Sequence, residues 1–159
     1  MRALKLLQLM TANSAAMSEQ LVNTIRESGR CKDLLEKVPE AEQRQYAAEI
    51  FRDLTEWLSY ESDGIIEQQY ISIGARRHSQ RVPITDLFWA VSAAREYLSN
   101  YTQQECLHDD KTDFLGGVTL LQSLNRFFDR TFYFALIGYQ EAEQADSAAV
   151  SVHSERWPA

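Results

Sequence analysis

Three arginines and a histidine stand close together in the segment GARRHSQR, residues 74–81. The planar N–H fork of arginine binds carboxylates and phosphates, so Arg76, Arg77 and Arg81 are candidates for holding an anion or an acidic partner. The alternative is that these cations stay in solvent and stabilise the negative C-terminal end of a helix. Arg77 also continues an apolar helical stripe made of Ile66, Tyr70 and Ile73. We therefore expect Arg77 to pair inward.

His78 lies inside the same cluster, and a single histidine is able to hold haem iron as its proximal ligand. A histidine among arginines is more often an ordinary surface residue whose charge follows the solvent pH. We predict no cofactor from the sequence and keep haem binding at His78 as an alternative.

An acidic stretch, Asp109–Asp113, invites comparison with a calcium-binding loop. Such a loop needs alternating oxygen ligands, a glycine at its sixth position and a glutamate at its twelfth. Here those two positions, counted from the first aspartate, hold Phe114 and Leu120. The neighbouring Cys106 and His108 lack the partners of a structural zinc site. We therefore predict no metal site and a solvated loop.

No arrangement of residues in the sequence predicts catalysis. The nucleophile elbow GxSxG, the P-loop, the dinucleotide fingerprint and the zinc motif HExxH are all missing. Arg126 and Asp129 stand three residues apart, a spacing at which they pair on the surface of one helix. Neither has a base and an orienting group nearby in the sequence. We predict no catalytic residues and expect that the protein is not an enzyme.

The most unusual element is an aromatic-rich helix, predicted over Leu120–Tyr139. Of the chain's 17 aromatic residues (7 Tyr, 7 Phe and 3 Trp), six lie between Phe127 and Tyr139. The helix begins as an amphipathic segment and continues into an apolar run at Phe132–Ile137. A helix that is apolar all round is buried on all sides, which a small protein does not easily achieve alone.

Three interpretations of this helix stay open at the level of sequence. Aromatic residues at helical spacing are usually core residues. A run wider than one face also fits a subunit interface, and the core of a helix bundle is a common place for a ligand cavity. The candidate interface residues are Phe127, Phe128, Phe132, Phe134, Ile137 and Tyr139.

The rest of the chain shows helical periodicity interrupted by clear breaks. Gly29 is expected to end the first helix, and Pro39 suits the first turn of a later one. Pro83 ends the segment that contains the arginines, because the residue before a proline is pushed out of the helical region. Gly74 costs about 1 kcal/mol relative to alanine inside a helix, so it marks a close approach by another helix. We predict a single all-α bundle of five or six helices.

Composition and charge narrow the class of protein further. The chain has 159 residues, of which 45% are hydrophobic and 25% charged, as in ordinary globular domains. Its net charge of −7 argues against nucleic acid as a partner. No apolar run reaches the roughly 18 residues of a membrane span. Two cysteines, Cys31 and Cys106, are too few for a disulfide scaffold, which favours reduced thiols and the cytoplasm. We place a helical domain at residues 1–145 and a disordered tail at 146–159.

Several segments carry a family resemblance: IGARR at 73–77, VPI at 82–84, Arg95 in the next amphipathic helix, NRFFDR at 125–130, Tyr133 and Gly138–Tyr139. Together they resemble the N-terminal sensor domain of RsbRD-type regulators, the co-antagonists of the stressosome. The resemblance covers about residues 18–143. It implies a helical input domain without catalysis that works as a homodimer ahead of an output module.

This chain departs from that plan, because no segment after Tyr139 fits an output domain. We therefore expect either a stand-alone sensor module or, as we prefer, a module that acts on a regulatory protein partner in trans, in bacterial stress or signal transduction. The resemblance extends to the related non-haem globin-like sensors, which keep a helical fold without a cofactor. The alternative function is a sensor that binds haem or another small apolar ligand among the aromatic residues.

Overall fold

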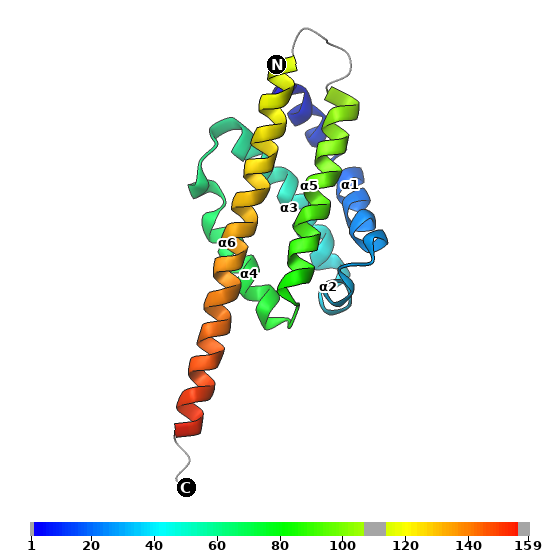
Figure 1. The fold of residues 1–159 in the computed structure, drawn as a ribbon. Coiled ribbons are helices and arrows are strands. Elements are labelled where there is room, and N and C mark those ends of the chain that lie inside the picture. Colours follow the sequence, from blue (N-terminus) through cyan, green and yellow to red (C-terminus); the bar gives the residue numbers. More distant parts are fainter. Residues whose placement is uncertain (1, 107–113, 156–159) are drawn as a thin grey trace.

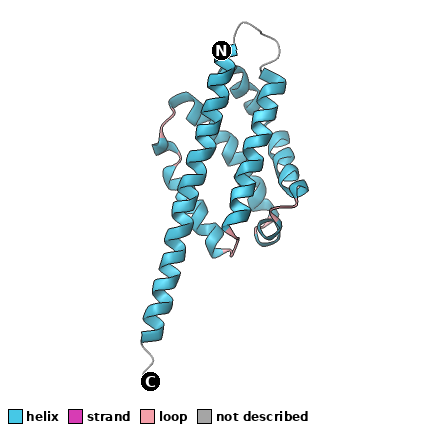
Figure 2. Cartoon of the chain, in the orientation of Figure 1, coloured by secondary structure: helices cyan, strands magenta, loops and turns pink. Residues whose placement is uncertain are grey.

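The computed structural model describes residues 2–106 and 114–155, and these form six α-helices, one short 3-10 helix and no strand (Figure 2). The predicted all-α bundle is therefore confirmed. No helix among the described residues has both the length and the apolar character needed to cross a membrane. In chain order the elements are α1 (Arg2–Ser28), α2 (Lys32–Lys37), α3 (Glu40–Tyr60), η1 (Asp63–Ile65), α4 (Glu67–Ser79), α5 (Ile84–Cys106) and α6 (Phe114–Glu155).

The long helix α6 lies along one face of the bundle beside α5 and extends past the other helices at its C-terminal end (Figure 1). The most extensive contact joins α4 to α6, followed by the contacts of α1 with α3 and with α5. Leu6, Phe51, Leu98 and Leu124 lie on four different helices and are almost completely buried in one shared core. A smaller apolar cluster forms where α2 lies against the start of α5.

Breaks in the helices occur where the sequence predicts them. Gly29 follows the last residue of α1 and has a φ of +69°, the left-handed conformation that glycine adopts without strain. Pro39 precedes the first residue of α3. Asn13 has non-helical angles, φ −121° and ψ 19°, so that α1 consists of two helical parts joined by a kink.

The contact between α4 and α6 brings the two backbones together. A Cβ atom on Gly74 would overlap the backbone carbonyl of Ala135, and a Cβ atom on Gly138 would overlap the backbone carbonyl of Ile71. Each helix thus supplies one glycine where the other helix's main chain passes. The predicted close approach at Gly74 is confirmed, and Gly138 is its counterpart on α6.

The polar edge of α6 pairs with neighbouring elements. The sequence predicts a pair between Arg126 and Asp129 on α6 itself, and this prediction is wrong. Asp129 instead accepts from Arg95 of α5 at 2.6 Å, while Arg126 pairs with Glu61 at 3.2 Å. Partners on other elements lie closer to these side chains than their own helix neighbours do. Such exposed pairs contribute at most about 1 kcal/mol each and mainly fix the orientation of α6.

The last helix is longer than predicted at both ends. It begins at Phe114, before the expected start at Leu120, and continues to Glu155. The segment 146–155, predicted as part of a disordered tail, is therefore helical in the structure, while 156–159 lie outside the described residues. The stretch from Gln140 to Val150 contains four alanines and neither glycine nor proline, which gives it high helix propensity without burial.

Candidate functional site

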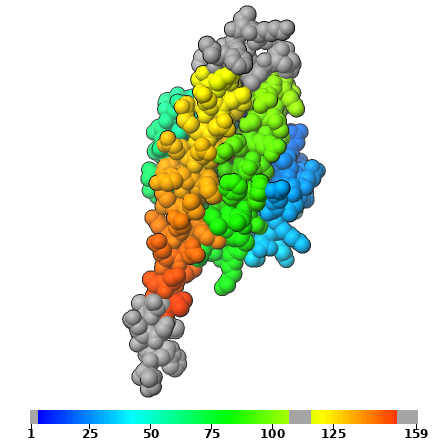
Figure 3. Space-filling model, in the orientation of Figure 1, coloured from blue at the N-terminus to red at the C-terminus, as the bar shows by residue number. Residues whose placement is uncertain are grey.

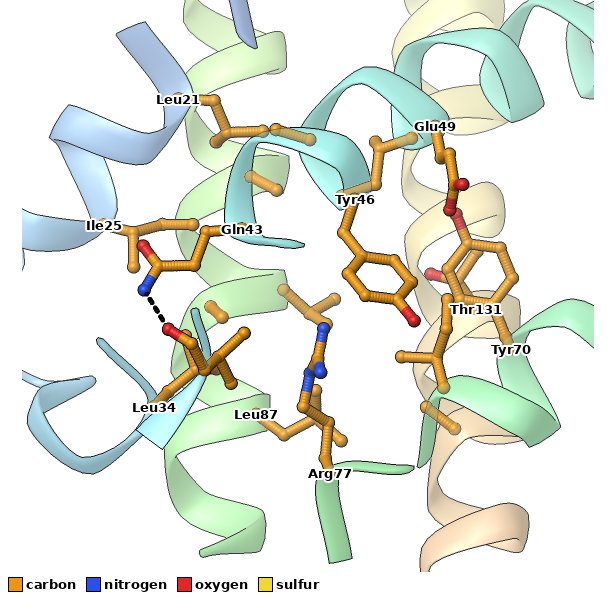
Figure 4. A pocket seen from close by; sticks show the side chains of 18 of the residues that line it. Leu21, Ile25, Leu34, Gln43, Tyr46, Glu49, Tyr70, Arg77, Leu87 and Thr131 are labelled. Atoms are coloured by element: carbon orange, nitrogen blue, oxygen red, sulfur yellow. Dashed lines mark hydrogen bonds between the residues drawn. The ribbon is translucent and has the colours of Figure 1, made fainter. Parts of the chain in front are cut away.

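A cavity of about 110 Å³ lies in the centre of the bundle, and all six helices contribute to its wall (Figure 4). Most of the wall is apolar. Leu21 and Ile25 come from α1, Leu34 from α2, and Leu87 from α5. From α6 the cavity is bounded by Phe127, Phe128, Thr131 and Ala135. The cavity therefore adjoins the helix in which the sequence predicts function.

Most polar side chains of the wall hold hydrogen bonds within the protein. Gln43 donates from Nε2 to the backbone oxygens of Leu35 at 3.1 Å and Val38 at 2.8 Å. The hydroxyl of Thr131 donates to the backbone oxygen of Phe128 at 3.0 Å. Because these groups already have partners, they offer little attraction to water inside the cavity.

Tyr70 closes another part of the wall through a buried carboxyl group. Its hydroxyl donates to Oδ2 of Asp53 at 3.1 Å, and Gln69 donates to the same oxygen at 2.7 Å. Burial raises the pKa of Asp53 above its usual range, and it raises the pKa of Tyr70 as well. This network anchors α4 to α3 and holds the tyrosine ring against the cavity.

Arg77 is the one cationic side chain in the wall, and it is only 5% exposed. Its guanidinium group lies beside the ring of Tyr46, with a distance of 4.4 Å between Cζ and the ring centre (Figure 4). Nη1 donates to Glu42 at 2.9 Å and to Gln80 at 2.7 Å. Within the part of the chain that the structure describes, Nε and Nη2 donate no hydrogen bond.

Two of the three predicted arginines, Arg76 and Arg77, bind the carboxylate of Glu42. Arg76 donates to it from Nε at 2.5 Å and from Nη2 at 2.9 Å, in addition to the bond from Arg77. The hydrogen bonds from Arg76, followed by those from Arg77, lower the pKa of Glu42 from 4.5 to about 2, although burial opposes the shift. Two guanidinium groups thus share one carboxylate, and one positive charge is left over.

The three predicted arginines have different environments. Arg77 pairs inward, as expected, while Arg76 remains half exposed on the outer side of Glu42. Arg81 is exposed beyond the end of α4, where its backbone has a φ of +62° and its carbonyl accepts from Lys37 at 2.8 Å. The structure therefore brings together Arg76 and Arg77 but leaves Arg81 outside the site.

Comparison with protein-family models, curated proteins and solved structures finds no match to this chain. The resemblance to RsbRD-type sensor domains therefore stays a prediction. The site has to be interpreted from its own geometry.

The aromatic candidates on α6 divide into three groups. Phe127 and Phe128 are buried in the cavity wall, and Phe134 is buried in the core. Tyr139 is partly buried and donates from its hydroxyl to the backbone oxygen of Val82 at 2.8 Å. Phe132 and Ile137 are also only partly buried. The helix is therefore buried by its own chain along one side only.

The partly covered side of α6 lies against α5. The rings of Phe132 and Phe88 meet edge to face at 5.6 Å, and Phe88 meets Trp89 in the same way at 5.4 Å. Phe88 and Trp89 remain 47% and 37% exposed, and Tyr133 is 55% exposed. The apolar run is therefore not buried on all sides within a single chain, because Phe132 is only partly buried and Tyr133 is exposed. We call Phe88, Trp89 and Phe132 the α5–α6 aromatic patch.

His78 does not line the cavity. Its ring packs edge to face on Tyr139 at 5.0 Å, and Nδ1 lies 3.5 Å from a carboxylate oxygen of Asp146. Asp129 of α6 pairs with Arg95 on the surface and does not reach the cavity either. Among the described residues no group of three or more His, Cys, Asp and Glu side chains is placed to hold a metal ion. The acidic stretch Asp109–Asp113 lies outside the described residues.

Sequence reasoning missed Glu42 and Tyr46, the two side chains that hold Arg77. Glu42 reads as a favourable charge in the first turn of its helix, and Tyr46 reads as part of the core stripe of α3. The signal that points to them is Arg77 itself, because an arginine that continues an apolar stripe needs a carboxylate from another element.

Proposed function

We propose that this protein is a non-catalytic regulatory module that binds a small apolar molecule in the central cavity and transmits the binding event through α6. The observation that carries the proposal is the path of α6. Four of its residues bound the cavity, and the same helix then continues beyond the body of the molecule (Figure 3). Ligand contact and a protruding output surface therefore share one rigid element.

The cavity has the size and chemistry of a site for a small apolar ligand. Its volume of about 110 Å³ approaches the roughly 150 Å³ of a dry protein cavity that takes up benzene. Ligand sites are typically concave and apolar with a few placed polar groups, and here the placed group is Arg77.

Transmission follows from how α6 is held near the cavity. Ala135 contacts Gly74 through its backbone and also lines the cavity. A ligand that pushes Phe127 or Phe128 outward would turn α6 about this contact, and packed helices respond by small discrete shifts. The shift occurs only to the extent that the ligand prefers one packing of the helix over the other.

The protruding part of α6 is the surface that we assign to the regulatory partner. The helix exposes its side chains from Glu143 to Val150, well beyond the cavity. When α6 turns about its contact with α4, the exposed side chains of its C-terminal part move with it, and a bound partner would detect that movement. The resemblance to RsbRD-type input domains supports the same class of function, a cytoplasmic sensor that acts on an output protein in signal transduction.

A second function, formation of a homodimer, is favoured by the α5–α6 aromatic patch. Exposed aromatic side chains that contact one another are typical of interaction sites. The partner that we propose is a second copy of the chain, because the patch runs along the paired helices α5 and α6 and permits symmetric packing of the two faces.

The binding proposal is tested by thermal unfolding of the full chain with benzene, toluene and cyclohexane. A ligand that binds only the folded protein stabilises it further as its concentration increases, so the melting temperature rises with the logarithm of ligand concentration above Kd. We expect a rise that grows with ligand concentration for at least one of these molecules, and no rise in the variant Ala94→Leu, which is designed to fill the cavity. Equal behaviour of the two proteins would refute the assignment of the site.

The homodimer is tested separately by sedimentation equilibrium. We expect Phe88→Glu to convert a dimer into a monomer, because the patch would then bury an unpaired charge. Tyr60→Glu is the matched control, since Tyr60 is 76% exposed at the far end of α3. A monomeric wild-type protein would refute the dimer without affecting the cavity.

A further inference from the structure

We infer that the ligand of the cavity is a small organic acid, with its apolar body in the cavity and its carboxylate on Arg77. This inference rests on the proposed function and adds the chemical class of the ligand. The observation behind it is that Arg77 is buried in the cavity wall, and that two of its three nitrogen atoms donate no hydrogen bond to residues 2–106 or 114–155.

The unused atoms form one edge of the guanidinium group. The N–H groups of Nε and Nη2 point the same way and bind the two oxygens of a carboxylate side by side. Arg76 shows this arrangement on Glu42, where the same two atoms donate at 2.5 Å and 2.9 Å. Arg77 reaches Glu42 with Nη1 alone, so its own edge remains available.

The surroundings of Arg77 leave that edge open. Tyr46 covers one face of the guanidinium plane, and stacking on a face does not block donors that point outward in the plane. An incoming carboxylate would supply acceptors for these two donors, and hydrogen bonds to a charged group are among the stronger ones. A neutral hydrocarbon would fill the cavity and leave these donors without partners.

Charge favours an anion at this end of the cavity. Two guanidinium groups share the single carboxylate of Glu42, which leaves one positive charge over. The other charged residue of the wall is Glu49, which lies near Tyr70 on the far side of the Tyr46 ring (Figure 4). The two ends of the wall therefore differ in sign, and this difference orients an acid with its carboxylate toward Arg77.

The size of the cavity sets the body of the acid. About 110 Å³ suits a short branched chain or a single aromatic ring rather than a long acyl chain. Isobutyrate and benzoate are suitable probes, and isobutyramide and benzamide are neutral molecules of nearly the same shape.

The test is isothermal titration calorimetry of the full chain at neutral pH with these two matched pairs. We expect at least one acid to bind about tenfold or more tightly than its amide, the usual effect of hydrogen bonds to a charged group. Equal affinity of acid and amide would overturn the inference and leave the cavity as an apolar site. Absence of binding by all four probes, together with no response to benzene or toluene, would overturn both proposals.

Variants locate the effect on one guanidinium group. Arg77→Leu is expected to abolish the preference for the acid, and Arg77→Lys, which keeps the charge and loses the fork, is expected to reduce it several-fold. Arg76→Leu is the comparison variant, because Arg76 does not border the cavity: the change removes the surplus positive charge at Glu42 but keeps the fork of Arg77, so we expect a weaker preference for the acid that does not disappear. A preference that survives Arg77→Lys unchanged, or disappears in Arg76→Leu, would contradict the assignment.

Discussion

The helix α6 meets its neighbours in two opposite ways within a few turns. At Gly74 and Gly138 it touches α4 backbone to backbone, with no room for a single added carbon atom. At Phe127 and Thr131 it faces a cavity of about 110 Å³. One contact is as tight as helices allow, and the other leaves space for a whole small molecule.

This difference shows how the bundle can be both stable and responsive. Interiors are normally packed to the density of organic crystals, so a cavity that persists beside a tight contact is costly to maintain. Ala135 belongs to both regions. The tight contact fixes a point on α6, and the cavity gives the adjoining turns freedom to move about that point.

The largest loss of stability is expected when a carbon atom is added at the tight contact between α4 and α6. Gly74→Ala gains about 1 kcal/mol of helix propensity, but its Cβ would overlap the backbone of Ala135. We expect a net loss of more than about 3 kcal/mol, because backbone cannot yield as a side chain does. Denaturant unfolding measures this loss. Gly64→Ala is the control, since its Cβ would meet only Ser62 at an ordinary 3.6 Å.

A smaller effect is expected at the carboxylate that holds the cavity side together. Glu42→Gln leaves Arg77 buried without its counter-charge, which we expect to cost roughly 2–3 kcal/mol in the free energy of unfolding. The matched control is Glu40→Gln in the same turn. Glu40 is exposed and pairs with the surface residues Arg26 and Arg44, so we expect a change of less than about 1 kcal/mol.

The same carboxylate gives the wild-type protein a defined sensitivity to acid. The pKa of Glu42 is about 2 in the folded protein, below its ordinary 4.5, so the folded state favours the ionised form. Its contribution to stability is complete above pH 4.5 and is lost as the pH falls toward 2. Unfolding curves between these pH values should converge for wild type and Glu42→Gln. A constant difference across that range would show that Glu42 contributes nothing through its charge.

The smallest effect is expected when a larger side chain is placed in the cavity, and its sign distinguishes the cavity from the tight contact. Ala94→Leu places three more carbon atoms in the cavity, and we expect about 1 kcal/mol of added stability, as filled cavities commonly give. Ala135→Leu adds the same atoms where α6 touches α4 and should destabilise instead. Thermal melting distinguishes the two signs. If both variants destabilise the protein, the cavity is not available space.

The sequence predicts the parts of this structure that depend on local patterns. Gly29 and Pro39 mark helix ends, Gly74 marks a helix crossing, and Arg77 stands on an apolar stripe and pairs inward. Each of these follows from backbone geometry or from the spacing of residues along one helix.

The remaining features depend on how separate helices fit together. The cavity is space that the side chains of six helices leave unfilled where they meet, and no periodicity within one helix encodes it. Glu42 lies 35 residues before Arg77, so their pairing appears only once α3 and α4 are packed. The segment 146–155 has a polar composition that predicts disorder, but it is helical in the structure, and its alanines favour a helix.

The central claim is that filling the cavity changes α6 beyond it, and hydrogen–deuterium exchange of the full chain with and without saturating benzoate tests it most directly. We expect benzoate to slow exchange at residues 127–135 and also to change the exchange rate at residues 139–150, outside the cavity. Ala94→Leu, which has no space for the ligand, should show neither. The claim would be contradicted if exchange along α6 were the same with and without the ligand, or changed only at the residues that line the cavity.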